Sequence, residues 1–76
     1  MNLEQMAYLV ELKRTQTLSQ AARNLNISQA GLSQSLDSLE AELGVKLFTR
    51  TRSGTRPTKA GEKMIGHAQE IESQLQ

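Results

Sequence analysis

The sequence predicts a mainly α-helical domain that carries one short β-hairpin. Apolar residues recur at helical spacing in four stretches of the chain. Aromatic residues make up only 3% and proline occurs once, whereas strand-rich domains usually hold more aromatic and β-branched residues. Ahead of the last helical stretch, threonine alternates with arginine around a Ser-Gly pair, which is typical of a hairpin. A hairpin this short must lean on the helices.

The composition excludes several classes of protein. At 76 residues the chain forms one small domain, and such a domain buries about 60% of the surface of its unfolded chain. It has no cysteine and one histidine, which excludes disulfides, cysteine-based zinc sites and a thiol nucleophile. We therefore expect neither a metal nor a cofactor. No stretch is long and apolar enough for a membrane span, and no signal peptide is visible, so we expect a cytoplasmic protein.

The first two helices are predicted from apolar spacing and from capping residues. Residues 3–14 place apolar side chains at i, i+3, i+4 and i+7, which predicts an amphipathic helix. Thr17 is expected to cap a short second helix, with Gln20 completing a capping box. Asn26 ends that helix because asparagine tolerates left-handed backbone geometry.

The third helix is expected to begin after Ser28, a second capping residue, and to end at Gly44. Its buried face is predicted to consist of Leu32, Leu36, Leu39 and Leu43. Its other face carries short polar side chains that can donate or accept hydrogen bonds, namely Gln29, Ser33, Gln34, Asp37 and Ser38.

The last helix follows the hairpin, is capped by Thr58 and runs to the end of the chain. Gly61 and Gly66 are expected to weaken it, each by about 1 kcal/mol relative to alanine. One face repeats apolar residues at heptad-like spacing, which predicts a dimer seam, although the same face could instead bury against its own domain. The expected dimer residues are Met64, Ile65, Ala68, Ile71 and Leu75.

Positive charge is concentrated in one segment. Residues 49–63 hold five of the nine basic residues and one acidic residue, although the net charge of the chain is only +1. A local basic patch of this kind suits a phosphate backbone.

Two short helices joined by a tight turn, with a polar first turn on the second, indicate a helix-turn-helix. The major groove of DNA accepts one helix, and base edges are reached from its exposed N-terminal half. Glutamine can pair with adenine through two hydrogen bonds, and serine can serve donor or acceptor edges. The predicted base-reading residues are therefore Gln29, Ser33 and Gln34.

Several ordered motifs resemble the N-terminal domain of LysR-type transcriptional regulators. They are Leu18-Ser19-Gln20-Ala21-Ala22, Leu25-Asn26-Ile27-Ser28-Gln29, Leu43-Gly44, Leu47-Phe48 and Thr58-Lys59-Ala60-Gly61. The match covers nearly the whole chain without a gap.

The resemblance implies a three-helix winged helix-turn-helix with a short two-stranded β-wing, followed by a long C-terminal linker helix. Residues 1–58 would form the DNA-binding domain, with the helix-turn-helix at about 18–37 and the wing at about 46–57. Residues 59–76 would form the linker and dimerisation helix. The effector-binding domain, and with it the small-molecule effector, would be absent from this chain.

The resemblance also implies a homodimer on an interrupted palindrome of double-stranded promoter DNA, within the nucleoid of a bacterial cytoplasm. Ala30 joins the base-reading residues on this basis. Contacts to the DNA backbone, or from the wing to the minor groove, are expected from Thr17, Ser28, Arg50, Arg52, Ser53, Arg56 and Thr58.

The chain departs from the family pattern at several positions. Gln34 stands where arginine is usual, which moves the expected preference from guanine toward adenine. Ser53 stands where the wing arginine is usual, with Arg52 one place earlier. Asp37 and Ser38 remove charge that would attract phosphate.

Two other functions remain open at this stage. A winged helix could instead serve as a protein-interaction or dimerisation module that reads no DNA sequence. It could also belong to another regulator family, such as the multiple-antibiotic-resistance type, although the short wing argues against this. An enzyme is not expected, because the carboxylate pairs Glu40/Glu42 and Glu70/Glu72 are spaced i, i+2 and point apart on a helix.

Overall fold

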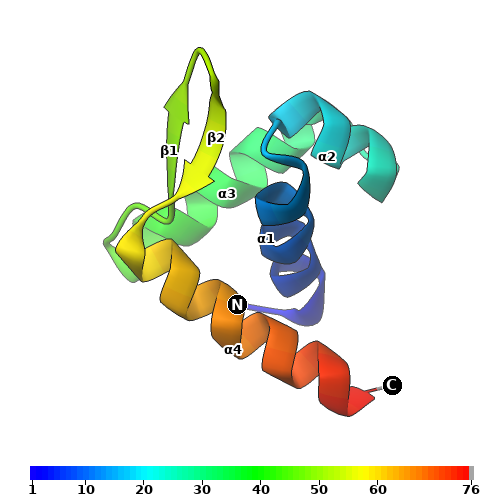
Figure 1. Cartoon of the computed structure of the whole chain (residues 1–76), viewed down its shortest axis with the longest axis vertical. Coiled ribbons are helices and arrows are strands. Elements are labelled where there is room, and N and C mark those ends of the chain that lie inside the picture. Colours follow the sequence, from blue (N-terminus) through cyan, green and yellow to red (C-terminus); the bar gives the residue numbers. More distant parts are fainter. Residues whose placement is uncertain (76) are drawn as a thin grey trace.

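The structure, a computed structural model, describes residues 1–75. The side chains of Glu72 and Leu75 lie outside the described residues, and so does the predicted dimer contact of Leu75. The elements, in chain order, are α1 (Leu3–Thr15), α2 (Leu18–Leu25), α3 (Gln29–Leu43), β1 (Phe48–Thr51), β2 (Gly54–Pro57) and α4 (Lys59–Leu75). Figure 1 shows the hairpin and α2 at one end of the domain, with α4 at the opposite end. The predicted fold class is confirmed.

Helix boundaries follow the capping residues. Thr17 and Ser28 cap α2 and α3 as predicted, and Gly44 ends α3 with left-handed backbone. The predicted capping box at Thr17 is only half present. The Thr17 hydroxyl accepts from the backbone N–H of Gln20 at 3.2 Å, but the Gln20 amide donates to Asn24 instead, at 2.9 Å.

A complete capping box stands at α1, where the sequence analysis did not place one. The Asn2 side chain accepts from the backbone N–H of Gln5, and the Gln5 side chain accepts from the backbone N–H of Asn2. Two of the free N–H groups at the start of α1 are satisfied in this way.

The core lies among α1, α2, α3, the start of the hairpin and the first half of α4. Its largest fully buried side chains are Leu12, Leu32, Leu39, Leu47 and Ile65. The prediction for α3 needs one correction, because Leu43 is 40% exposed. Leu43 lies at the C-terminal end of α3, so the apolar stripe extends beyond the part of the helix that packs against the core.

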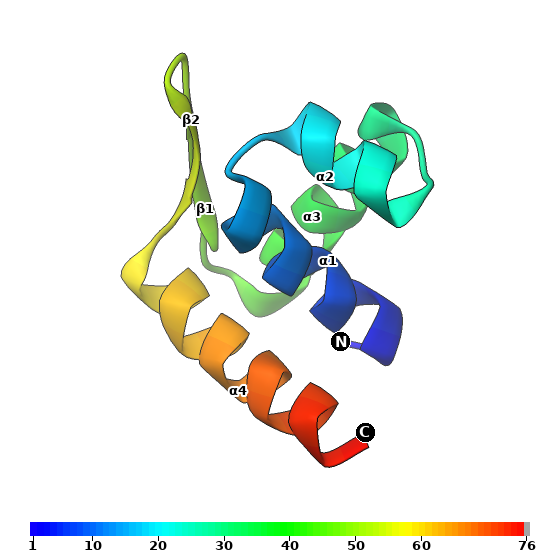
Figure 2. The same cartoon turned by 45° about the vertical axis from the view of Figure 1, so that its right-hand side comes forward.

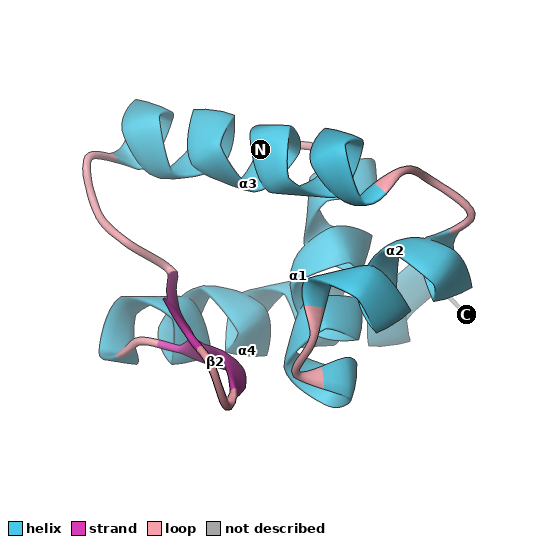
Figure 3. Ribbon diagram, turned by 90° about the horizontal axis from the view of Figure 1, so that it is seen from above, coloured by secondary structure: helices cyan, strands magenta, loops and turns pink. Residues whose placement is uncertain are grey.

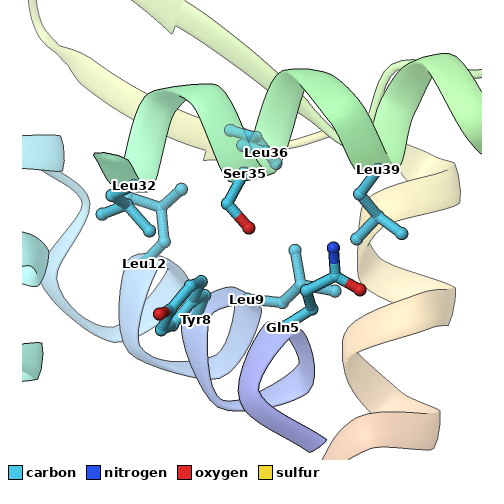
Figure 4. A pocket seen from close by; sticks show the side chains of 8 residues that line it. All are labelled: Gln5, Tyr8, Leu9, Leu12, Leu32, Ser35, Leu36 and Leu39. Atoms are coloured by element: carbon cyan, nitrogen blue, oxygen red, sulfur yellow. The ribbon is translucent and has the colours of Figure 1, made fainter. Parts of the chain in front are cut away.

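Apolar side chains of α1 and α3 enclose a small gap, shown in Figure 4. Leu9 and Leu12 face Leu32, Leu36 and Leu39 across it. Its volume is about 10 Å³, which is at most enough for one water molecule. The gap is a packing feature of the core and offers no room for a small-molecule ligand.

Helix α4 crosses α1 and packs against it (Figures 1 and 2). Ile65 and Ala68 are completely buried in this contact. The first half of α4 is thus part of the domain's own core, although the sequence assigned it to a separate linker.

Gly61 allows the start of α4 to approach the hairpin. A Cβ atom at this position would lie 1.9 Å from the backbone oxygen of Leu47, which is far inside contact distance. Gly66, five residues later, faces open space. The expectation that both glycines weaken the helix is therefore incomplete, because Gly61 is needed for packing.

None of the helices in the described part of the chain has the length and apolar character that crossing a bilayer requires.

Candidate nucleic-acid interface

The first two turns of α3 present a polar surface. Gln29, Ala30 and Gln34 are exposed, and Ser33 is half-buried beside them. The structure brings all four predicted base-reading residues together at the N-terminal end of one helix, and we call this set the reading face. Figure 3 shows α2 and α3 joined by a short turn, which is the helix-turn-helix arrangement.

The start of α3 is fixed by its cap. The Ser28 hydroxyl accepts from the backbone N–H of Gly31 at 2.9 Å. A Cβ atom at Gly31 would lie 2.9 Å from that hydroxyl oxygen.

The hairpin pairs β1 with β2 in antiparallel register, from Phe48 opposite Pro57 to Thr51 opposite Gly54. The turn between α1 and α2 anchors it. The backbone oxygen of Gln16 accepts from the N–H of Thr55 at 2.8 Å, and its side-chain oxygen accepts from Arg56 at 3.3 Å.

The contact between this turn and the hairpin depends on two residues with positive φ angles. Gln16 has a φ of 65°, and Gly54 has a φ of 138°. A Cβ atom at Gly54 would lie 2.8 Å from the Gln16 oxygen, so only glycine suits this contact. The role of Gln16 could not be predicted, because a polar residue after a helix gives no sign of a partner 39 residues away.

Glu40 fixes the start of the hairpin from α3. Its carboxylate is 5% exposed and accepts from the backbone N–H groups of Leu47, at 2.6 Å, and Phe48, at 3.2 Å. The Lys46 ammonium lies 3.7 Å from the other carboxylate oxygen. Glu40 was predicted neither to be buried nor to bind the hairpin. Its position next to Leu39, on the leucine face, was the available signal that it is buried.

Arg50 of β1 reaches across to α3. Its guanidinium donates to the Ser33 hydroxyl at 3.1 Å and to the Asp37 carboxylate at 2.7 Å. Arg50, which was predicted to contact DNA from the wing, therefore lies against the reading face. Asp37 was predicted to lie on the polar face of the helix and to remove charge that would attract phosphate, but its contact with Arg50 was not predicted.

The remaining predicted wing residues differ in their surroundings. Arg52 and Ser53 are exposed in the hairpin turn, and Ser53 shares a hydroxyl hydrogen bond with Thr51. Thr58 is half-buried, and its hydroxyl donates to the backbone oxygen of Lys46 and accepts from the N–H of Gly61. Thr58 thus has a structural role as the cap of α4.

The predicted dimer residues also differ in their burial. Ile65 and Ala68 require correction, because both are completely buried within this single chain and have no surface to offer a partner. Met64 is half-buried, and Ile71 is 38% exposed. Met64 and Leu43 border a shallow apolar groove between α3 and α4.

Comparison with known proteins identifies the family. The family described as bacterial regulatory helix-turn-helix protein, lysR family, matches residues 3–62, which is most of the chain. The chain belongs to the LysR family. It is 41% identical, over 93% of its length, to the probable HTH-type transcriptional regulator LrrA of Synechococcus elongatus, and equally to the nitrogen assimilation regulatory protein nac of Klebsiella aerogenes. It covers 24% and 23% of those proteins, so it spans about a quarter of the curated relatives it matches.

Solved structures of LysR-family domains share the fold. A complex of the BenM DBD with catB site 1 DNA matches 99% of this chain at a TM-score of 0.93, with 31% identity, and this chain covers 83% of it. A CbnR DBD–DNA complex matches 99% of this chain at a TM-score of 0.91, with 29% identity, and is covered to 86%. The chain is thus a LysR-type winged helix-turn-helix domain.

Proposed function

We propose that this chain binds double-stranded DNA in a sequence-specific manner, as the DNA-binding domain of a bacterial transcriptional regulator. The observation that carries the proposal is the exposed reading face on the first two turns of α3, flanked by an arginine-bearing hairpin. The BenM and CbnR neighbours, whose structures contain DNA, support DNA binding by a chain of this fold.

In this proposal α3 enters the major groove. Gln29 and Gln34 are long, exposed amides suited to adenine, and Ser33 serves a neighbouring base edge. Arg52 and Arg56 bring positive charge to the DNA backbone or to the minor groove. Beside Ser28, backbone N–H groups in the first turn of α3 can donate to a phosphate.

The active form in this proposal is a homodimer. Two copies place their α3 helices in successive major grooves, about 34 Å apart, on an interrupted palindrome. Of the predicted dimer residues with described side chains, Met64 and Ile71 retain accessible surface on α4. Control by a small-molecule effector belongs to the remaining three quarters of a full-length relative. The proposed role is regulatory, without catalysis, in the bacterial cytoplasm.

The test is a selection from random DNA. The 76-residue chain is mixed with random-sequence duplexes at two salt concentrations, and the retained duplexes are sequenced. We expect them to share an interrupted palindrome, with affinity that falls steeply as salt rises. Salt-sensitive retention without a shared sequence would contradict sequence-specific binding by this chain. Absence of binding at low salt would favour the protein-interaction alternative.

Matched variants locate the surface responsible. The double substitution Gln29→Ala with Ser33→Ala should abolish the shared sequence while leaving part of the salt-sensitive binding. Its control is Gln74→Ala with Ser73→Ala, which removes the same chemistry from exposed positions on α4. Equal effects of the two pairs would refute the assignment of the reading face.

A further inference from the structure

The contact among Arg50, Asp37 and Ser33 joins the hairpin to the reading face. The guanidinium donates to both α3 side chains, and Asp37 is accessible, with 59% of its side chain exposed. Arg50 is 35% exposed in the same pair. The pair therefore lies at the surface, where another anion can compete for the arginine.

Asp37 continues the row of base-reading residues. Gln29, Ser33 and Asp37 are spaced four residues apart, which places them along one side of α3. A carboxylate on this side repels phosphate, and an arginine on the same side attracts it. Because the two are bonded to each other, their charges cancel at the edge of the reading face.

We propose that Asp37 is a specificity-determining residue, which holds Arg50 on α3 and thereby weakens binding to DNA that lacks the recognised sequence. This inference rests on the proposed DNA-binding function. Binding to arbitrary sequence depends on phosphate contacts, whereas operator binding also uses base contacts from Gln29 and Gln34. Withholding one arginine from phosphate lowers both kinds of binding, so a change in the preference for the operator must come from what the arginine does to the base contacts.

Arg50 in the paired position also acts on Ser33. The hydroxyl oxygen of Ser33 accepts from the guanidinium, so its proton points elsewhere and remains free to donate. Breaking the Asp37 contact releases Arg50 from this position. Both kinds of binding then gain a cation, but operator binding also loses an oriented hydroxyl, which lowers the preference for the operator.

The test substitutes Asp37→Asn in the 76-residue chain and measures fluorescence anisotropy on a labelled random-sequence duplex and on the operator recovered by selection. One additional phosphate contact steepens the slope of log affinity against log salt by about 0.9. Near 0.1 M salt, this corresponds to random-sequence binding that is about fivefold to tenfold tighter. Operator affinity should rise by less, so that the ratio of the two affinities falls at least threefold.

Two controls separate this effect from a change in net charge. Glu42→Gln removes one negative charge from the same helix, where the Glu42 carboxylate lies 3.8 Å from the N-terminal amine and is 65% exposed. In the Arg50→Gln background, Asp37→Asn should no longer steepen the salt slope, because no arginine is released. Circular dichroism melting confirms that each variant is folded.

The outcomes are distinct. A steeper slope and a lower ratio for Asp37→Asn, absent in Glu42→Gln and in the Arg50→Gln background, support the inference. An unchanged slope, an unchanged ratio, or an equal effect of Glu42→Gln overturns it while leaving the proposed function intact. A wild-type chain that binds no duplex refutes the proposed function and this inference together.

Discussion

Glu40 and Asp37 lie three residues apart on α3 and both contact the hairpin, but they differ in burial. Glu40 is 5% exposed and binds two backbone N–H groups, whereas the Asp37 side chain is 59% exposed and binds the Arg50 side chain. Water competes for the second contact and is excluded from the first. The same chemical group therefore stabilises the fold at one position and is available to influence binding at the other.

The comparison extends to the segments that surround each carboxylate. Around Glu40, the start of the hairpin is buried, with Leu47 at 0% and Phe48 at 3% exposure. Around Asp37, the reading face is polar and open. We therefore expect substitutions at the hairpin start to change the free energy of unfolding, and substitutions on the reading face to change DNA binding.

Gly61→Ala should produce the largest loss of stability. The added methyl group would lie 1.9 Å from the Leu47 oxygen, so α4 must move away from the hairpin. We expect a loss of about 3 kcal/mol or more in the free energy of unfolding, measured by urea denaturation. Gly66→Ala is the matched control and should stabilise the chain by about 0.5–1 kcal/mol, because that position is open. Equal effects of the two substitutions would contradict the close approach.

Glu40→Ala should follow in size. It leaves two buried N–H groups, those of Leu47 and Phe48, without their acceptor. A loss of about 2–3 kcal/mol in the free energy of unfolding is expected. Glu42→Ala, on the same helix with an exposed side chain, should change it by less than about 0.5 kcal/mol. A Glu40 variant as stable as the Glu42 variant would contradict a structural role for the buried Glu40 carboxylate.

Gly61 and Glu40 also show how much of the fold can be predicted from the sequence. Helices and caps depend on residues close together in the chain, so apolar spacing and Thr17, Ser28 and Gly44 were enough to place them. The close approach at Gly61 is a contact between distant segments, and a glycine in a helix looks the same whether it is crowded or open. The position of Glu40 next to Leu39 could indicate burial, but its two N–H donors lie outside α3 and could not be predicted from the helix.

The candidate site divides in the same way. The reading face could be predicted because it occupies two turns of one helix. The partner of Arg50 could not, because Asp37 lies 13 residues away on another element. Ile65 and Ala68 fit a dimer seam by spacing, but spacing cannot distinguish a face that covers its own domain from one that covers a second copy.

Glu11 provides an intermediate case, with 19% of its side chain exposed. Hydrogen bonds from Arg14, and then from Asn24, hold the pKa of the Glu11 carboxyl below its usual value. A lowered pKa in the folded state means that these contacts stabilise the chain above the ordinary carboxyl pKa and are lost as the pH falls through the folded value. Glu11→Gln should therefore destabilise the chain at pH 7 and cost less below pH 4, as measured by urea denaturation at both pH values. An equal cost at both would contradict a role for the carboxylate charge.

Gln34→Arg should have the smallest effect on stability, within about 0.5 kcal/mol, because the side chain is exposed on the reading face. It should nevertheless change the preferred base, because arginine pairs with guanine through two hydrogen bonds. Such a pair discriminates against the wrong base by about 1–3 kcal/mol. Selection from random duplexes should then recover a palindrome with guanine at the position where the wild-type chain selects adenine. Gln74→Arg adds the same charge on α4 and should tighten binding to all sequences without changing which bases are retained. If both variants retain the wild-type sequence, Gln34 contacts no base, and sequence readout by α3 rests on Gln29 and Ser33 alone.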